Sequence, residues 1–282
     1  MKTIKILLIL LVMLSLIACS FTVNVPSIRT GATQTLQVSE DIEPDTEVSL
    51  VTIEMGAGEL NLYGGSDKLV EGTVLYNVEA WKPVITRDGS SLNLSQKTNA
   101  DISIPDGNYK NEWNLKLGST PIDLSLMTGA YKGNLDLSGV PITRLSVADG
   151  ASSSKIRFDS LNPVAMSELS YNTGASEVEV LGIGNANVTN VNFDSGVGSF
   201  TLDFSGENPV DINVSITSGM SDLKLILPDN VMAKVIVNGE LNNIDLQGTW
   251  TVEGSTYTYG SVGSLVTITV DMAVGNLQLI QQ

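Results

Sequence analysis

Short apolar–polar–apolar triplets recur along the middle of the chain, each a few residues after a glycine. These glycines are Gly129, Gly150, Gly174, Gly196 and Gly219, and they are 21, 24, 22 and 23 residues apart. Alternation with a period of two residues, as in Val178-Glu-Val180, predicts β-strands. A repeat unit of this length cannot bury its own apolar face, so successive copies must stack on one another.

The same alternation begins before the regular repeats, between Val51 and Leu62. Beyond residue 18, no segment keeps apolar residues at helical spacing over three turns. We therefore expect an all-β protein, a right-handed single-stranded β-helix (solenoid) with coils of 20–24 residues. The five repeat glycines are expected at its corners with positive φ, where a side chain would be strained.

The central residue of each triplet should point into solvent. If the repeats are aligned on their triplets, these residues are Asp136, Arg157, Glu179, Thr201, Lys224 and Asp245. Neighbouring strands lie about 4.8 Å apart, so the alignment predicts one column in which opposite charges face each other. The alternative is that charges on a solvated face fall in this order by chance.

The first residues predict a secretory signal. Two lysines precede an apolar run from Ile6 to Ala18, which is shorter than the ~20 residues of a membrane-spanning helix. Leu16-Ile17-Ala18-Cys19 resembles a bacterial lipobox, and Cys19 is the only cysteine. We expect residues 1–18 to be removed and Cys19 to carry lipid at the extracytoplasmic face of the cell membrane or the outer membrane. The alternative is an ordinary signal peptide with an incidental cysteine.

Composition divides the mature chain into three regions. Residues 19–46 are rich in Ser, Thr, Gln and acidic side chains and are expected to form a tether behind the lipidated cysteine, followed by a first weak strand near Thr35-Leu-Gln-Val38. Residues 47–112 are expected to form an N-terminal β region with irregular repeats, ending in a polar stretch with a Pro105-Asp-Gly107 turn. Residues 113–282 are predicted to be the solenoid repeats with a C-terminal cap.

The charge balance excludes some partners. There are 31 acidic and 15 basic side chains, a formal net charge of −16. Phosphate backbones would be repelled, so we expect no nucleic acid partner. Anionic lipid would be repelled too, so the lipid on Cys19 must hold the protein at the membrane. The acidic residues form no long run, which favours solvated strand faces over calcium sites.

The sequence contains few of the residue patterns that enzymes use for catalysis. The chain has no histidine, which excludes Ser-His-Asp and Cys-His sites and histidine metal sites. A glycosidase could pair two of the carboxylates Asp123, Asp136, Asp149 and Asp159, and a calcium-dependent lyase could use Arg144 or Arg157. Neither alternative comes with a motif. We predict no catalytic residue, no cofactor and no metal site, and hence no enzyme.

Several segments carry a resemblance to a known family. They are Trp113-Asn-Leu-Lys-Leu117, Gly133-Asn-Leu-Asp-Leu-Ser-Gly139, Asn172-Thr-Gly-Ala175 and Ser195-Gly-Val-Gly198. These segments resemble the toast-rack family of bacterial envelope proteins, over roughly residues 47–248. That family is related to the domains called putative adhesins and to the C-terminal domain of cell-wall-active-antibiotic-response regulators. The resemblance implies a β-helix and supplies no catalytic residues.

These observations favour a non-catalytic, lipid-anchored β-solenoid that presents a binding or scaffolding surface to an envelope protein or glycan. An alternative, by analogy with the response regulators, is an accessory or sensor protein of the envelope stress response. A carbohydrate-active enzyme is the second alternative.

Overall fold

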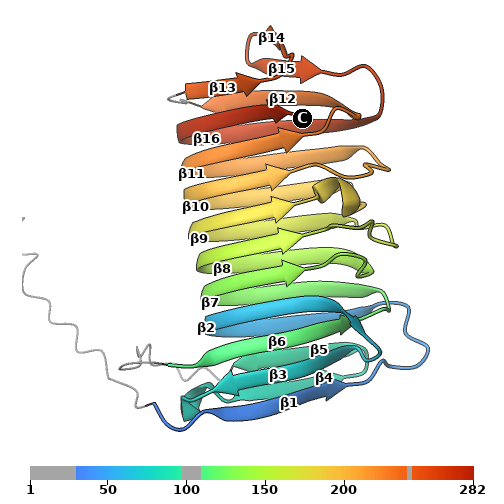
Figure 1. The fold of residues 1–282 in the computed structure, drawn as a ribbon, viewed down its shortest axis with the longest axis vertical. Helices are drawn as coiled ribbons and strands as arrows, with labels where there is room; N and C mark the ends of the chain where they lie inside the picture. The colour runs from blue at the N-terminus through green and yellow to red at the C-terminus, as the bar shows by residue number, and fades with distance from the viewer. Residues whose placement is uncertain (1–29, 97–108, 240–242) are drawn as a thin grey trace, which may run out of the picture.

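The computed structural model describes residues 30–96, 109–239 and 243–282. Figure 1 shows a tall stack of strands, and hydrogen bonding joins them into one 16-stranded sheet. None of the described residues lies in an α-helix, so the all-β prediction is confirmed. The described part also contains two 3-10 turns, η2 (Glu79–Trp81) and η3 (Ile183–Asn185).

The middle of the stack is built from long strands of 14 to 18 residues. They are β2 (Ser49–Ser66), β7 (Ile122–Asp136), β8 (Ile142–Arg157), β9 (Glu168–Leu181), β10 (Asn190–Asp203), β11 (Ile212–Leu227) and β16 (Ser264–Gln281). The shorter strands are β1 (Gln34–Glu40), β3 (Val70–Tyr76), β4 (Pro83–Asp88), β5 (Ser91–Gln96), β6 (Asn111–Gly118), β12 (Val231–Gly239), β13 (Asn243–Gln247), β14 (Thr251–Glu253) and β15 (Thr256–Tyr259).

The long strands pair in parallel, and the repeats bring like residues side by side. Ile156 of β8 lies beside Val180 of β9, which lies beside Leu202 of β10. All three side chains are buried. Columns of this kind form a continuous aliphatic core along the stack, and burying them is the main stabilising contribution.

The long strands from β2 to β11 each bend at a glycine, whereas β16 bends at Ala273, and burial shows where. In β9 the odd-numbered residues from Leu169 to Thr173 are buried, whereas after Gly174 the even-numbered residues from Ser176 to Val180 are buried. The glycine and the residue after it are both exposed, so the alternation changes phase there. Outward side chains before and after the bend therefore form two surfaces, which we call the first-half face and the second-half face.

The predicted positive φ at the five repeat glycines is wrong. Positive φ is found at other glycines, but at none of Gly129, Gly150, Gly174, Gly196 and Gly219. These glycines instead stack directly on one another. A Cβ on Gly174 would lie 2.5 Å from the carbonyl oxygen of Gly150, and a Cβ on Gly196 would lie 2.4 Å from that of Gly174. Close approach of neighbouring backbones excludes a side chain here.

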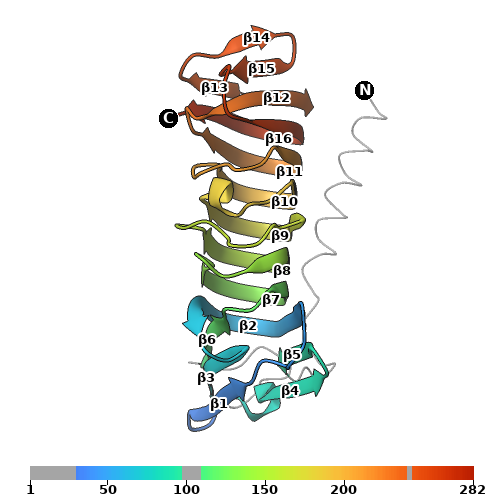
Figure 2. The same cartoon turned by 90° about the vertical axis from the view of Figure 1, so that its right-hand side faces the viewer.

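At both ends of the stack, a strand from later in the chain inserts beside a long strand. β6 lies between β3 and β2, and β16 lies between β11 and β12. Figure 2 shows the β4–β5 hairpin at one end and the β14–β15 hairpin at the other. The sheet runs through residue 112 without a break, and the division into regions at that point stays a prediction.

Candidate binding face

The first-half face carries a row of side chains without charge. One residue from each long strand contributes, and consecutive members are register partners across the strand pairs. The members are Thr52, Ser125, Ser146, Ser170, Asn192, Ser215 and Thr269. We call this set the neutral row. Each member is a hydroxyl or an amide, so the row offers both hydrogen-bond donors and acceptors along the stack.

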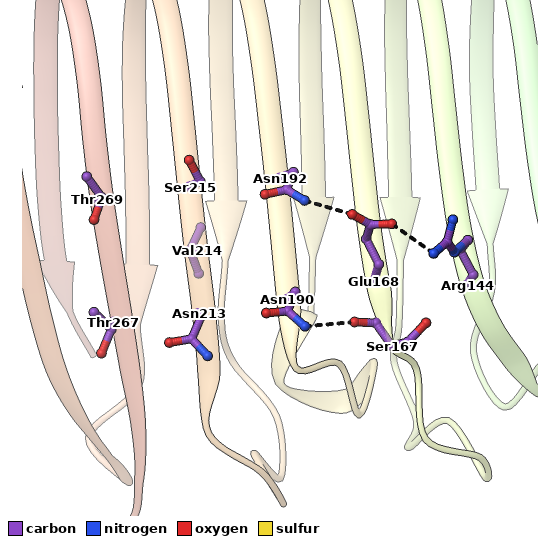
Figure 3. Close-up of a pocket in the computed structure, with 10 residues that line it drawn as sticks. All are labelled: Arg144, Ser167, Glu168, Asn190, Asn192, Asn213, Val214, Ser215, Thr267 and Thr269. Carbon is purple, nitrogen blue, oxygen red and sulfur yellow. Dashed lines mark hydrogen bonds and ion pairs between the residues drawn. The ribbon is translucent and has the colours of Figure 1, made fainter.

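Part of this face is hollowed to a volume of about 470 Å³, across β8 to β16 (Figure 3). Its lining comes mainly from the neutral row and from the next outward position on each strand, which is two residues earlier in the chain. The lining residues are Arg144, Ser167, Glu168, Asn190, Asn192, Asn213, Val214, Ser215, Thr267 and Thr269. Val214 is buried, so the side chains that the hollow presents to solvent are polar or charged ones.

The charged side chains of this lining neutralise each other. Arg144 Nη2 lies 3.4 Å from Glu168 Oε2. Asn192 Nδ2 donates to the other carboxylate oxygen, Oε1, at 2.8 Å (Figure 3). Glu168 is thus held from both sides, and the hollow presents a paired carboxylate rather than a free one.

The other end of the hollow is unengaged. Within the described part of the chain, the side chains of Asn213, Ser215, Thr267 and Thr269 make no hydrogen bond to protein. They lie on β11 and β16 and are exposed or half-buried. Their donors and acceptors are therefore free for solvent or a ligand.

The edge of the hollow is fixed by hydroxyls that bind the preceding strand. Thr143 Oγ1 donates to the Ile122 carbonyl at 3.0 Å, and Ser167 Oγ donates to the Thr143 carbonyl at 3.1 Å. Thr189 Oγ1 and Asn190 Nδ2 each donate to the Ser167 carbonyl at 3.1 Å. These bonds tie the starts of β8, β9 and β10 to the preceding strand or loop and so fix this edge of the lining.

The second-half face is charged. It carries the residues of the predicted charge column, but in a different alignment. Asp136 lies beside Arg157, whose Nη2 is 2.7 Å from Asp136 Oδ2. Arg157 faces Leu181 of β9, not Glu179. Glu179 lies beside Lys155, whose Nζ is 2.7 Å from Glu179 Oε2. The predicted single column is therefore two columns that are offset by one outward position.

This error arises from two buried positions that lack aliphatic side chains. In the observed register, Gly133 of β7 and Ser154 of β8 occupy the place that Val178 occupies in β9. Tyr131 fills the space beside them: a Cβ on Gly133 would lie 2.6 Å from Tyr131 Cε2. An alignment on apolar triplets skips these positions and shifts β7 and β8 by two residues relative to β9.

The C-terminal end of the predicted charge column, from Thr201 to Asp245, is interrupted by the inserted strand β16. Thr201 lies between Glu179 and Lys224, as the alignment placed it. Lys224, however, does not meet Asp245, because Gln278 of β16 lies between them. The predicted contact between Lys224 and Asp245 is therefore wrong.

The carboxylates considered for a glycosidase lie on different parts of the surface. Asp123 is on the first-half face, where burial raises the pKa of its carboxyl and Arg144 opposes the rise. Asp149 is buried at a bend. Asp136 and Asp159 both contact Arg157, at 2.7 and 3.6 Å. Of these four carboxylates, none lines the hollow.

Asp149 has a structural role that the sequence reasoning missed. Its Oδ1 accepts from Thr173 Oγ1 at 2.5 Å and Ser176 Oγ at 3.1 Å. Its Oδ2 accepts from the Tyr171 hydroxyl at 2.7 Å and Ser152 Oγ at 3.0 Å. Four hydroxyl donors thus satisfy a buried carboxylate. Burial, together with this neighbouring carboxylate, raises the pKa of Tyr171.

Three further predictions concern metal sites, membrane-spanning helices and the signal peptide. Across residues 30–96, 109–239 and 243–282, no group of three His, Cys, Asp or Glu side chains could hold a metal ion. In the same ranges, no helix is long and apolar enough to cross a membrane. The predicted signal peptide and Cys19 lie outside the described residues.

Fold and surface together define an all-β protein of stacked repeats, with a charge-free row of polar side chains on one face and paired charges on the other. A family model described as the N-terminal domain of toast_rack, DUF2154, matches residues 28–163 and 160–226. The chain therefore belongs to the toast-rack family, as its repeats indicated. No curated protein shows significant similarity to the chain.

Solved structures give distant matches. A crystal structure described as a "putative cell adhesion protein" from Clostridium sporogenes is 21% identical, covers 89% of this chain and 99% of its own, and has a TM-score of 0.43. A "putative adhesin" from Bacteroides fragilis is 13% identical, covers 90% and 100%, and has a TM-score of 0.36. A "putative lipid binding protein" from Parabacteroides distasonis is 11% identical, covers 89% and 99%, and has a TM-score of 0.37.

Proposed function

We propose that this protein is a non-catalytic binding protein of the bacterial envelope and that its first-half face is the binding surface. The neutral row is the observation that supports this most directly. It runs through seven strands without a charge, in a chain with 31 acidic side chains, whereas the second-half face carries charges that pair internally. A surface with unengaged polar groups can bind a partner without first breaking ion pairs.

The architecture that presents this face is, in our proposal, a right-handed single-stranded solenoid with coils of 20–24 residues. Stacked coils repeat the same outward positions and so give a long, regular surface. Loops and strand ends at the rim hold the hollow in place, so binding needs little reordering of the protein.

Attachment to the membrane is proposed to occur through lipid on Cys19, with the residues between Cys19 and β1 (Gln34–Glu40) as the tether. The supporting observation is the lipobox-like Leu16-Ile17-Ala18-Cys19 with no second cysteine. Cys19→Ala should move the protein from the membrane fraction to the soluble fraction of fractionated cells. A Cys19→Ala protein that is processed normally and stays in the membrane fraction would remove the anchor from the proposal.

The binding face is tested with the full-length protein in detergent and envelope material from the producing cells, extracted with organic solvent to remove lipid. Thr269→Glu places an unpaired charge on the neutral row. Thr201→Glu places the same charge on the second-half face and serves as the matched control. We expect Thr269→Glu to reduce retention about tenfold or more, and Thr201→Glu to leave it unchanged. Equal retention of both variants would contradict the assignment of the face.

A further inference from the structure

We propose that the ligand of the first-half face is an uncharged polysaccharide chain that lies across the strands from β8 to β16. This inference rests on the proposed function, because it names the ligand class of the same face. It is argued from the chemistry, the charge and the spacing of the residues that line the hollow.

The chemistry of the lining matches sugar hydroxyls. A sugar hydroxyl both donates and accepts hydrogen bonds, and so do the hydroxyls of Ser215, Thr267 and Thr269 and the amide of Asn213. In the described part of the chain these four side chains are unengaged. A ligand that could only accept or only donate would leave half of this capacity unsatisfied.

The charge of the lining disfavours an ionic ligand. Among the described residues that line the hollow, the charged side chains are Arg144 and Glu168, which pair at 3.4 Å. Glu168 is also held by Asn192. An anionic polymer would find no free cation there and would meet a protein with a formal net charge of −16. A cationic ligand would have to compete with Arg144 for Glu168.

The spacing of the lining favours a polymer over a single sugar. Neighbouring strands lie about 4.8 Å apart, and the register places one polar side chain of the neutral row on each. An extended pyranose chain has a repeat of the same order, so successive sugars would meet equivalent groups. The lining contains no aromatic ring on which a sugar could stack. Hydrogen bonds exposed to water contribute little singly, so useful affinity requires many of them along one chain.

The test uses the same delipidated envelope material in two treated forms and two charge variants at one position. Periodate destroys the vicinal diols of sugars, and proteinase K destroys protein. Thr269→Lys and Thr269→Glu place charges of opposite sign on the neutral row, and Thr201→Lys and Thr201→Glu are the matched controls on the second-half face. Retention of full-length protein in detergent is measured at low and high salt. Thermal melts check that each variant is folded, and the corresponding Ser215 pair replaces any Thr269 variant that is not.

We expect binding that survives proteinase K, is lost after periodate and is insensitive to salt. Both Thr269 variants should bind about tenfold more weakly, because either charge must be desolvated against a neutral ligand. If Lys strengthens binding and Glu weakens it, the ligand is anionic and the inference is overturned. Binding that survives periodate and is lost to proteinase K overturns it in favour of a protein partner.

In either overturning result the proposed binding face stands if the Thr269 variants differ from the Thr201 controls. If the Thr269 variants bind as their Thr201 controls do, the face itself is wrong, and the inference falls with it.

Discussion

The stacked glycines give the most direct test of how the repeats are held in register. In Gly196→Ala the new Cβ would lie 2.4 Å from the Gly174 carbonyl oxygen and 3.4 Å from the Gly174 carbonyl carbon. Ordinary contact begins at 3.4 Å, so β9 and β10 must separate by about 1 Å at the bend. The backbone φ of Gly196 is not positive, so any loss of stability comes from this contact.

The size of the stability loss follows from the backbone hydrogen bonds between β9 and β10. Lengthening an N–H···O hydrogen bond from about 2.9 to about 3.9 Å breaks it. Each buried backbone group left unpaired costs about 1–3 kcal/mol. We therefore expect Gly196→Ala to lower the free energy of unfolding by about 2–4 kcal/mol, with a melting temperature lower by roughly 5–15 °C.

Two comparison variants separate this explanation from the φ explanation. Gly150→Ala should cost less, because its Cβ would lie 2.9 Å from the Gly129 carbonyl oxygen. Gly89 has a φ of +56° with nothing within 4 Å of an added Cβ, so Gly89→Ala tests backbone strain alone, about 1 kcal/mol.

The assay is thermal and urea unfolding followed by circular dichroism. We expect Gly196→Ala to be the most destabilised variant, followed by Gly150→Ala and then Gly89→Ala. If Gly89→Ala is more destabilised than Gly196→Ala, backbone conformation rather than interstrand contact dominates, and the reasoning is refuted.

Three further predictions concern side chains inside and outside the stack. Asp149→Ala should lower the free energy of unfolding by about 2–5 kcal/mol in urea melts, because three buried hydroxyls and one half-buried hydroxyl lose their acceptor, whereas Asp149→Asn should cost less. Lys155→Ala should lower the free energy of unfolding by less than about 1 kcal/mol, because its ion pair with Glu179 is exposed. A larger loss in the same urea melts would contradict this placement of Lys155. Burial raises the pKa of Tyr171 above its unfolded value of about 10, so the stability it contributes is present below pH 10 and is lost as pH rises beyond it. Tyr171→Phe should make melts recorded above pH 10 less sensitive to pH, and an unchanged pH slope would contradict this.

The fold class could be predicted because the repeat signal is local. Apolar residues at every second position mark the strands, and the five glycines mark the bends, whatever surrounds them. The register could not be predicted in the same way. It depends on Gly133, Ser154 and Tyr131, where an aromatic side chain from one position fills the space of two others. Hydrophobic pattern alone contains no information about such an exchange of volume.

The sequence contains only a weak signal for the structural role of Asp149. In the other four of the five glycine-marked repeats the residue before the bend glycine is Thr or Ser, as at Thr173, and Asp149 replaces that hydroxyl with a carboxylate. From the sequence alone a solvent-facing acid is expected here, because Asp is rarely buried. What makes its burial tolerable is the set of hydroxyls from β8 and β9, and their convergence is visible only once the strands are stacked.

The first-half face was invisible in the sequence for a related reason. Each strand contributes one member of the neutral row, such as Ser146 or Ser215, and a single serine in a strand has no meaning by itself. Charges attract attention in a sequence, and here they point to the second-half face, where Lys155 and Arg157 are already paired with carboxylates. The absence of charge becomes informative only after the register aligns seven such positions. For a repeat protein, an alignment anchored on the bend glycines is therefore better suited to finding binding surfaces than one anchored on the apolar triplets. The glycines keep the register because backbone contact fixes them, whereas the triplets shift wherever the core exchanges one large side chain for two small ones.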